Sequence, residues 1–173
     1  MNDTLRLYGL VAESIVDGPG YRTAIFTQGC RHACPGCHNP GSHALEGGTL
    51  WTLDDIAQKF THNPLLSGIT LSGGEPFLQA AGCAELARRA HGKGLTVWTY
   101  SGYTYEQLCA LAEREAPVAA LLQQTDVLVD GRFVLAERSL ELQFCGSRNQ
   151  RVIDLAKTRA AGSVVLYQAP AWC

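Results

Sequence analysis

Three cysteines lie within eight residues of one another, at Cys30, Cys34 and Cys37. Three thiols cannot all pair as disulfides among themselves, and Pro35-Gly36 turns the chain so that the sulfurs can point to one centre. Thiolates are the ligands of iron–sulfur clusters and of zinc. A four-iron cluster held by three cysteines would keep one iron open, whereas a closed zinc site would need a fourth protein ligand. The neighbouring histidines that could supply that ligand are His32, His38 and His43. The spacing favours the cluster and leaves zinc as the alternative.

The other cysteines are Cys83, Cys109, Cys145 and Cys173, and none of them forms a C-x-x-C pair. We expect them to be buried or bystander thiols rather than ligands of a second cluster. The N-terminus, Met1-Asn2-Asp3-Thr4, lacks the basic and apolar regions of a signal peptide. Cysteines without a secretion signal predict a reducing, cytoplasmic location.

The composition predicts one globular domain that spans residues 1–173. Hydrophobic residues make up 46% of the chain and charged residues 17%, which suits a packed core and not a disordered chain. The net charge of −2 gives no electrostatic reason to expect nucleic acid or an acidic membrane as a partner. No apolar run reaches the length of a transmembrane helix.

Apolar segments alternate with helical patterns along most of the chain. The expected strands are 23–27, 68–71, 95–99, 126–129 and 163–167, with a further short strand within 5–16, and the expected helices are 52–61, 76–91, 104–115 and 152–160. The middle strands are apolar on both faces, which indicates parallel strands joined by helical crossovers. The α/β fold therefore has about five or six mostly parallel strands, too few for a complete eight-stranded barrel.

Four segments that could carry chemistry follow four of the expected strands. They are residues 30–38, Ser72–Glu75, Tyr100–Tyr103 and Asp130–Arg132. Because ligands of parallel α/β folds bind beyond the carboxyl ends of the strands, we expect all four segments to line one mouth.

Two of these segments also have a plain structural interpretation. Gly73 and Gly74 permit close backbone approach to a ligand and Glu75 could bind a cationic group, but Glu75 could equally favour the start of a helix. Asp130-Gly131 could contact a ligand, although the apolar residues on either side are typical of a β-hairpin or a simple turn.

These motifs together resemble those of a known superfamily. Cys30, Cys34 and Cys37 followed by a Gly-Gly-Glu segment resemble the radical S-adenosylmethionine (SAM) superfamily, and residues 16–20 and 37–40 resemble its glycyl-radical-enzyme activases. The segments that are similar to the activating proteins of anaerobic ribonucleoside-triphosphate reductase are 70–76, 97–103, 126–133 and 146–150. The resemblance spans residues 8–153.

The resemblance implies a partial, incomplete β/α barrel of the radical SAM type. It implies that Cys30, Cys34 and Cys37 hold one [4Fe-4S] cluster whose open iron binds SAM. The residues implied to contact SAM are Ser72, Gly73, Gly74 and Glu75 at the methionyl ammonium and Gly36, Cys37 and His38 at the adenine. No side chain is implied as a general base or a nucleophile.

The implied activity is reductive cleavage of SAM to methionine and a 5′-deoxyadenosyl radical, which forms a glycyl radical on a partner enzyme. The implied partners are the large subunit of anaerobic ribonucleoside-triphosphate reductase and a flavodoxin-like electron donor. Activation of pyruvate formate-lyase and a zinc-stabilised binding protein remain the alternatives. Cys145 and the tail 157–173 have no counterpart in the resemblance.

Overall fold

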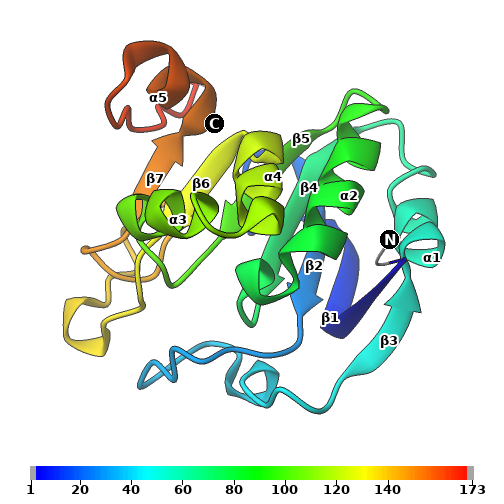
Figure 1. The fold of residues 1–173 in the computed structure, drawn as a ribbon, viewed down its shortest axis with the longest axis horizontal. Coiled ribbons are helices and arrows are strands. Elements are labelled where there is room, and N and C mark those ends of the chain that lie inside the picture. Colours follow the sequence, from blue (N-terminus) through cyan, green and yellow to red (C-terminus); the bar gives the residue numbers. More distant parts are fainter. Residues whose placement is uncertain (1–2, 171–173) are drawn as a thin grey trace.

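A computed structural model describes residues 3–170 and places their strands in one seven-stranded sheet (Figure 1). Its strand order is β3-β1-β2-β4-β5-β6-β7. The strands are β1 (Thr4–Ser14), β2 (Tyr21–Thr27), β3 (Thr49–Thr52), β4 (Leu66–Gly73), β5 (Thr96–Tyr100), β6 (Val127–Asp130) and β7 (Arg151–Asp154). Cys173 lies outside the described residues.

The sheet confirms the α/β class but is less parallel than the sequence predicts. Neighbouring strands β2, β4, β5 and β6 run parallel, whereas β1 is antiparallel to both β2 and β3, and β7 is antiparallel to β6. The sheet is open, with β3 and β7 as its edges. The expectation of about five or six mostly parallel strands is therefore wrong in number and direction at both edges.

Between residues 3 and 170, five α-helices connect or flank the strands: α1 (Leu53–Lys59), α2 (Ala80–His91), α3 (Tyr105–Ala112), α4 (Ala116–Gln124) and α5 (Leu155–Ala161). Three short 3-10 helices are η1 (Pro40–Ser42), η2 (Pro76–Gln79) and η3 (Leu135–Glu137). Thr104 and Gln107 form the predicted capping box of α3, and the Thr52 hydroxyl caps α1. Within residues 3–170, the helices are too short or too polar to cross a membrane.

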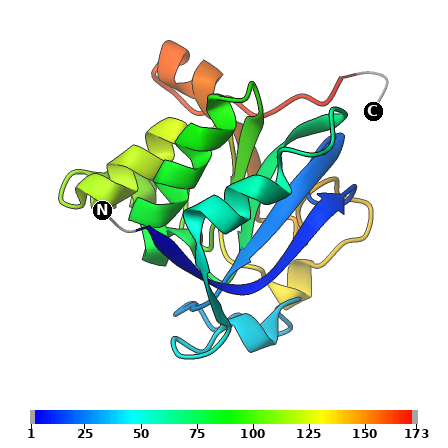
Figure 2. The same cartoon turned by 90° about the vertical axis from the view of Figure 1, so that its right-hand side faces the viewer.

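The two faces of the sheet are covered differently. Ile69, Leu71 and Val97 pack with residues of α1 to α4 in the main hydrophobic core. Figure 2 shows α2, α3 and α4 on one side of the sheet and the segment 131–150 on the other. On that second face, Trp98 and Val129 belong to a smaller cluster. One face of the sheet therefore packs on helices, while the other remains accessible to a ligand.

The sequence misplaces several elements near the chain ends. The expected helix 152–160 begins as strand β7 and becomes helical only at α5, because Val152 and Ile153 pair with β6. The expected strand 163–167 is reduced to a bridge between Leu166 and Ile153. The sequence predicts neither strand β3, whose residues are mostly exposed, nor helix α4.

Candidate functional site

A cavity of about 680 Å³ lies beyond the carboxyl ends of the parallel strands. Cys30, Cys34, Cys37, Ser72, Gly73, Gly74, Tyr100, Ser101, Gly102 and Gly131 line it together. Each of the four segments expected at the mouth thus contributes to its wall, which confirms that prediction. The lining residues not predicted for the site include Val11, Asp17, Phe133, Phe144 and Gly146.

The cysteine loop leaves β2 and is pinned where it begins and ends. The backbone N–H of Gly29 donates to the carbonyl of Ser42 at 2.8 Å, and that of Cys30 donates to the carbonyl of His43 at 3.1 Å. Within the loop, Ala33 and Gly36 have positive φ angles of 50° and 73°. These reversals turn the cysteine-bearing backbone within a short span.

The three thiols of this loop suit an iron–sulfur cluster by their chemistry. Cys30, Cys34 and Cys37 are free, partly buried and on the wall of the same cavity. Among residues 3–170, no group of three or more Cys, His, Asp or Glu side chains is arranged to hold a single metal ion. A four-iron cluster spreads its cysteine ligands over separate irons, and thiolates are its normal ligands. Burial raises the pKa of the Cys30 thiol.

Gly73, the last residue of β4, and Gly74, which follows it, leave room for other parts of the backbone to approach closely. A Cβ on Gly73, whose φ is 89°, would lie 2.6 Å from the Cα of Phe26, and one on Gly74 would lie 2.3 Å from the carbonyl oxygen of Gly29. The backbone N–H of Glu75 donates to that same Gly29 carbonyl at 2.8 Å. The Gly-Gly-Glu segment is therefore fitted directly against the start of the cysteine loop.

The Glu75 carboxylate lies behind the cavity wall rather than on it. Glu75 is 1% exposed and is not among the cavity-lining residues. Its oxygens accept hydrogen bonds from the His32 ring at 2.8 Å, the Gly102 N–H at 2.9 Å, the Ser101 hydroxyl at 3.0 Å and the Phe77 N–H at 3.1 Å. The bond to Phe77 caps η2, so the helix-start interpretation is correct. An ammonium contact to Glu75 stays a prediction.

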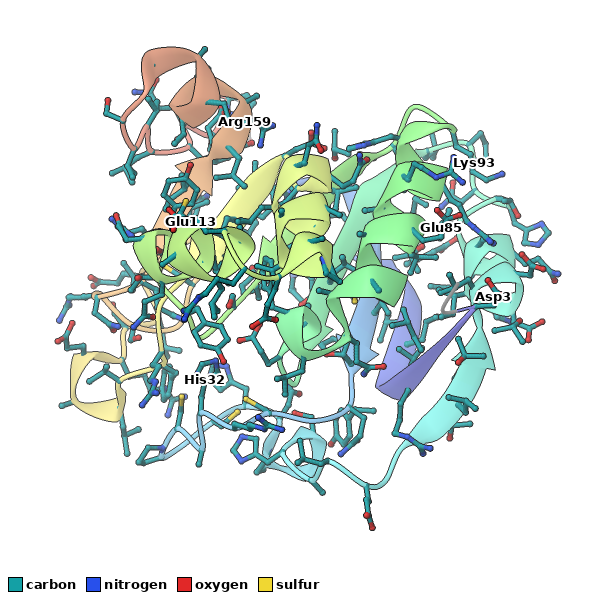
Figure 3. The ribbon with its side chains drawn as sticks, viewed as in Figure 1. Asp3, His32, Glu85, Lys93, Glu113 and Arg159 are labelled. Carbon is teal, nitrogen blue, oxygen red and sulfur yellow. The ribbon has the colours of Figure 1, made fainter. Side chains whose placement is uncertain are left out.

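His32 is the residue of the cysteine loop that contacts the Gly-Gly-Glu segment. Figure 3 marks it on the segment that follows β2. Its side chain is only 5% exposed, and its ring meets that of Tyr103 edge-on with centroids 4.5 Å apart. The sequence offers it as one of three possible zinc ligands, whereas in the structure its Nε2 is directed to Glu75. The sequence gives no signal for this pair, because its members come from different segments.

The residues expected near an adenine are Gly36, Cys37 and His38, and two of them line the cavity. Cys37 and His38 line the cavity, and the His38 ring lies against the Phe133 ring with centroids 5.3 Å apart. Gly36 is not among the lining residues, and a Cβ on it would lie 2.9 Å from Leu135. Leu135 therefore leaves no room for a side chain at Gly36.

The segment 131–150 closes one side of the cavity. The sequence predicts no helix or strand within it. Phe144 has a φ of 61°, uncommon for a bulky residue, and its carbonyl accepts a 2.6 Å hydrogen bond from the Tyr100 hydroxyl. The rings of Phe144 and Trp98 pack edge-on at 5.1 Å. The next residue, Cys145, lines the cavity, so it is not a remote bystander thiol. Burial raises the pKa of Tyr100, which keeps this donor protonated.

Asp130 has a structural role. Its carboxylate accepts hydrogen bonds from the Arg151 guanidinium and from the Tyr105 N–H at 2.7 Å. The local hairpin interpretation is wrong, because the strand that pairs with β6 begins only at Arg151. Gly131, with a φ of 95°, is the part of this segment that reaches the cavity.

Comparisons with known proteins agree with this arrangement of thiols. Residues 16–153 match the family model of the 4Fe-4S single cluster domain, which supports a [4Fe-4S] cluster. The anaerobic ribonucleoside-triphosphate reductase-activating protein of Vibrio cholerae is 35% identical over 79% of the chain and 89% of its own length. The protein of that name from Salmonella typhi is 32% identical over 87% and 99%. The pyruvate formate-lyase-activating enzyme of Clostridium pasteurianum is 33% identical, over 58% of the chain and 44% of its own length.

Proposed function

Because the chain belongs to the family of anaerobic ribonucleoside-triphosphate reductase-activating proteins, we propose that it activates that reductase by forming a glycyl radical on its large subunit. The chain is an activating enzyme of the radical SAM type. The observation that carries the proposal is that three free thiols, Gly73 and Gly74 border one cavity, with Glu75 directly behind its wall.

In this proposal, Cys30, Cys34 and Cys37 hold one [4Fe-4S] cluster. Bound there, the cluster supplies one electron to the sulfonium of SAM, giving methionine and a 5′-deoxyadenosyl radical that removes a hydrogen atom from the partner's glycine. The chain's own residues position the reactants and exclude water and other hydrogen donors. A flavodoxin-like protein is the proposed electron donor, and the cytoplasm is the proposed location.

In this proposal SAM lies along the cavity, with its adenine at Gly36, Cys37 and His38 and its methionyl end at Ser72, Gly73 and Gly74. The cavity is lined by all of these residues except Gly36, which supports the proposal. The cavity volume of about 680 Å³ is within the range of small-molecule sites.

The Glu75 carboxylate is proposed to bind the methionyl ammonium of SAM once the Ser101 hydroxyl rotates away from it. The Ser101 hydroxyl lies between the cavity and Glu75 and is 3.0 Å from both carboxylate oxygens. It has one proton and can rotate, so turning it toward another acceptor would free a lone pair of Glu75. Loss of SAM affinity in Glu75→Gln would support this contact.

The open sheet is proposed to be a truncated barrel, with the face opposite α2, α3 and α4 as its interior. This face, which carries Trp98 and Val129, is covered by segment 131–150 instead of by further strands and helices. In this proposal, the glycine-bearing segment of the partner protein reaches the cavity from this face of the sheet.

Activation of pyruvate formate-lyase is the second candidate function. The similarity to the Clostridium pasteurianum enzyme favours it, but that similarity covers less of both chains than the matches to reductase activators do. The proposal predicts a glycyl signal in electron paramagnetic resonance with the reductase subunit and none with pyruvate formate-lyase. The reverse result would reassign the partner.

The experiment that tests the reaction is anaerobic reconstitution with iron and sulfide, followed by a strong reductant and SAM. The proposal predicts a brown protein that releases 5′-deoxyadenosine and methionine in equal amounts. A protein that binds four irons and four sulfides but releases no 5′-deoxyadenosine would contradict it.

A further inference from the structure

The cysteine loop is attached to the rest of the site by a side chain that lies between two of its cysteines. His32 follows Cys30 by two residues and precedes Cys34 by two. Its Nε2 donates to the Glu75 carboxylate at 2.8 Å, and both side chains are almost fully buried, at 5% and 1% exposed. A buried hydrogen bond to a carboxylate is among the stronger polar contacts in a protein.

The surroundings of His32 are shaped to hold its ring. Tyr103 packs edge-on against one side of it, with centroids 4.5 Å apart. On Gly102, a Cβ would lie 2.3 Å from Cδ2 and 2.6 Å from Nε2 of the ring, so this position needs glycine for the ring to fit. Since the Gly102 N–H also donates to Glu75, ring and backbone share one carboxylate.

Glu75 joins three of the four segments that form the mouth. It belongs to the Gly-Gly-Glu segment, accepts from His32 of the cysteine loop, and accepts from Ser101 and Gly102 after β5. We propose that His32 is a positioning residue, which fixes the cysteine loop to Glu75 so that Cys30 and Cys34 are held in place to bind the cluster. This inference rests on the proposed function only in identifying the group that the thiols hold.

Thiol reactivity in the cluster-free protein gives the first test. Cys30, Cys34 and Cys37 would be alkylated under oxygen-free conditions, with rates for each residue read by mass spectrometry. His32→Ala should speed alkylation of Cys30 and Cys34 several-fold and leave Cys109, outside the site, unchanged. Equal rates in the wild type and His32→Ala would overturn the proposal, whether or not the protein cleaves SAM.

Cluster retention gives the second test. After reconstitution, iron release to a chelator should be about 10-fold faster in His32→Ala than in the wild type. Mutating residues that support the ligands of a metal typically costs about 10- to 100-fold in affinity, and we expect the smaller of these effects here. Gly102→Ala should do the same, because its Cβ displaces the ring. His32→Gln keeps an N–H donor and should restore slow release.

Matched controls separate positioning from a general loss of folding. His62→Ala removes an exposed histidine outside the site, and Gly9→Ala adds a Cβ where no atom lies within 4 Å. Both should release iron at the wild-type rate. His32→Gln releasing iron as fast as His32→Ala would overturn the role of the hydrogen bond. If the wild type binds the cluster without cleaving SAM, the proposed function fails while this inference stands.

Discussion

The hydroxyl of Tyr100 donates a 2.6 Å hydrogen bond to the carbonyl of Phe144, which holds a bulky residue at a φ of 61°. Tyr100 ends β5, whereas Phe144 lies in the irregular segment 131–150. Because a non-glycine residue in this conformation is maintained only when its surroundings hold it, this bond fixes one wall of the cavity.

Removing this bond should affect ligand binding more than stability. Tyr100→Phe should reduce the free energy of unfolding by about 1 kcal/mol, the usual net value of one hydrogen bond, and weaken SAM binding several-fold. Urea denaturation and equilibrium dialysis with SAM check the two effects. Tyr21→Phe, at an exposed position, serves as the control. Unchanged SAM affinity in Tyr100→Phe would show that this wall does not contact the ligand.

Replacing one cysteine of the loop should remove the cluster altogether. In Cys34→Ala only two thiols of the loop remain, so reconstituted protein should lack the brown colour and should release no 5′-deoxyadenosine. Iron and sulfide analysis and chromatography of the products measure this. Cys109→Ala, which alters a thiol outside the cavity, should retain both properties. SAM cleavage at the wild-type rate by Cys34→Ala would refute the ligand assignment.

The second glycine of the Gly-Gly-Glu segment should be as important for the cluster as for SAM. In Gly74→Ala the new Cβ would meet the Gly29 carbonyl at 2.3 Å, so the end of β4 must move away from the start of the cysteine loop. We expect lower iron content and a loss of about 1–3 kcal/mol in the free energy of unfolding, as for other overpacked sites. Gly9→Ala is the matched control. Full iron content with only SAM binding lost would mean that Gly74 matters for the ligand alone.

An ionic network on α2 predicts how stability depends on acid. Hydrogen bonds from Arg88 and Arg89 lower the pKa of Glu85 to about 2. An unfolded Glu has a pKa of about 4.3, so the contribution of Glu85 is complete above that pH and is lost as the pH falls toward 2. Because Glu85 and Arg89 are partly exposed and Arg88 is exposed, we expect a contribution of less than about 1 kcal/mol.

Urea denaturation of the cluster-free protein between pH 7 and pH 2.5 measures this contribution. Glu85→Gln should lower the midpoint at pH 7 and lose less stability than the wild type on acidification. Glu46→Gln, another exposed glutamate, should behave as the wild type. Parallel curves for the wild type and Glu85→Gln would show that the network does not stabilise the fold.

The parallel strands could be predicted from the sequence because burial on both faces leaves a continuous apolar run. Ile69 to Leu71 and Val97 to Thr99 are fully or almost fully buried and form the centre of the sheet. The edge strands do not show this pattern. Residues of β3 are mostly exposed, and the pairing of β7 with β6 depends on contacts that are distant in sequence, such as Arg151 with Asp130. Local patterns contain no information about such pairs.

The site shows the same division between local and distant determinants. The cysteine spacing and the Gly-Gly-Glu segment are short motifs, and the rule that ligands bind at the carboxyl ends of parallel strands brings them to one mouth. The roles of Glu75 and His32 depend on groups contributed by separate segments, so residue type alone suggested other functions for both. The wall formed by Phe144 could not be predicted, because its conformation is imposed by Tyr100.

The backbone bonds from Gly29 to Ser42 and from Cys30 to His43 have a thermodynamic consequence. They close the cysteine loop through backbone groups alone, without the cysteine thiols. Bringing the ends of a flexible loop together reduces its conformational entropy, and here that reduction belongs to the folding of the whole chain. Assembly of the metal centre then has to order only the interior of a loop that is already closed, so less of its binding free energy is offset by chain ordering.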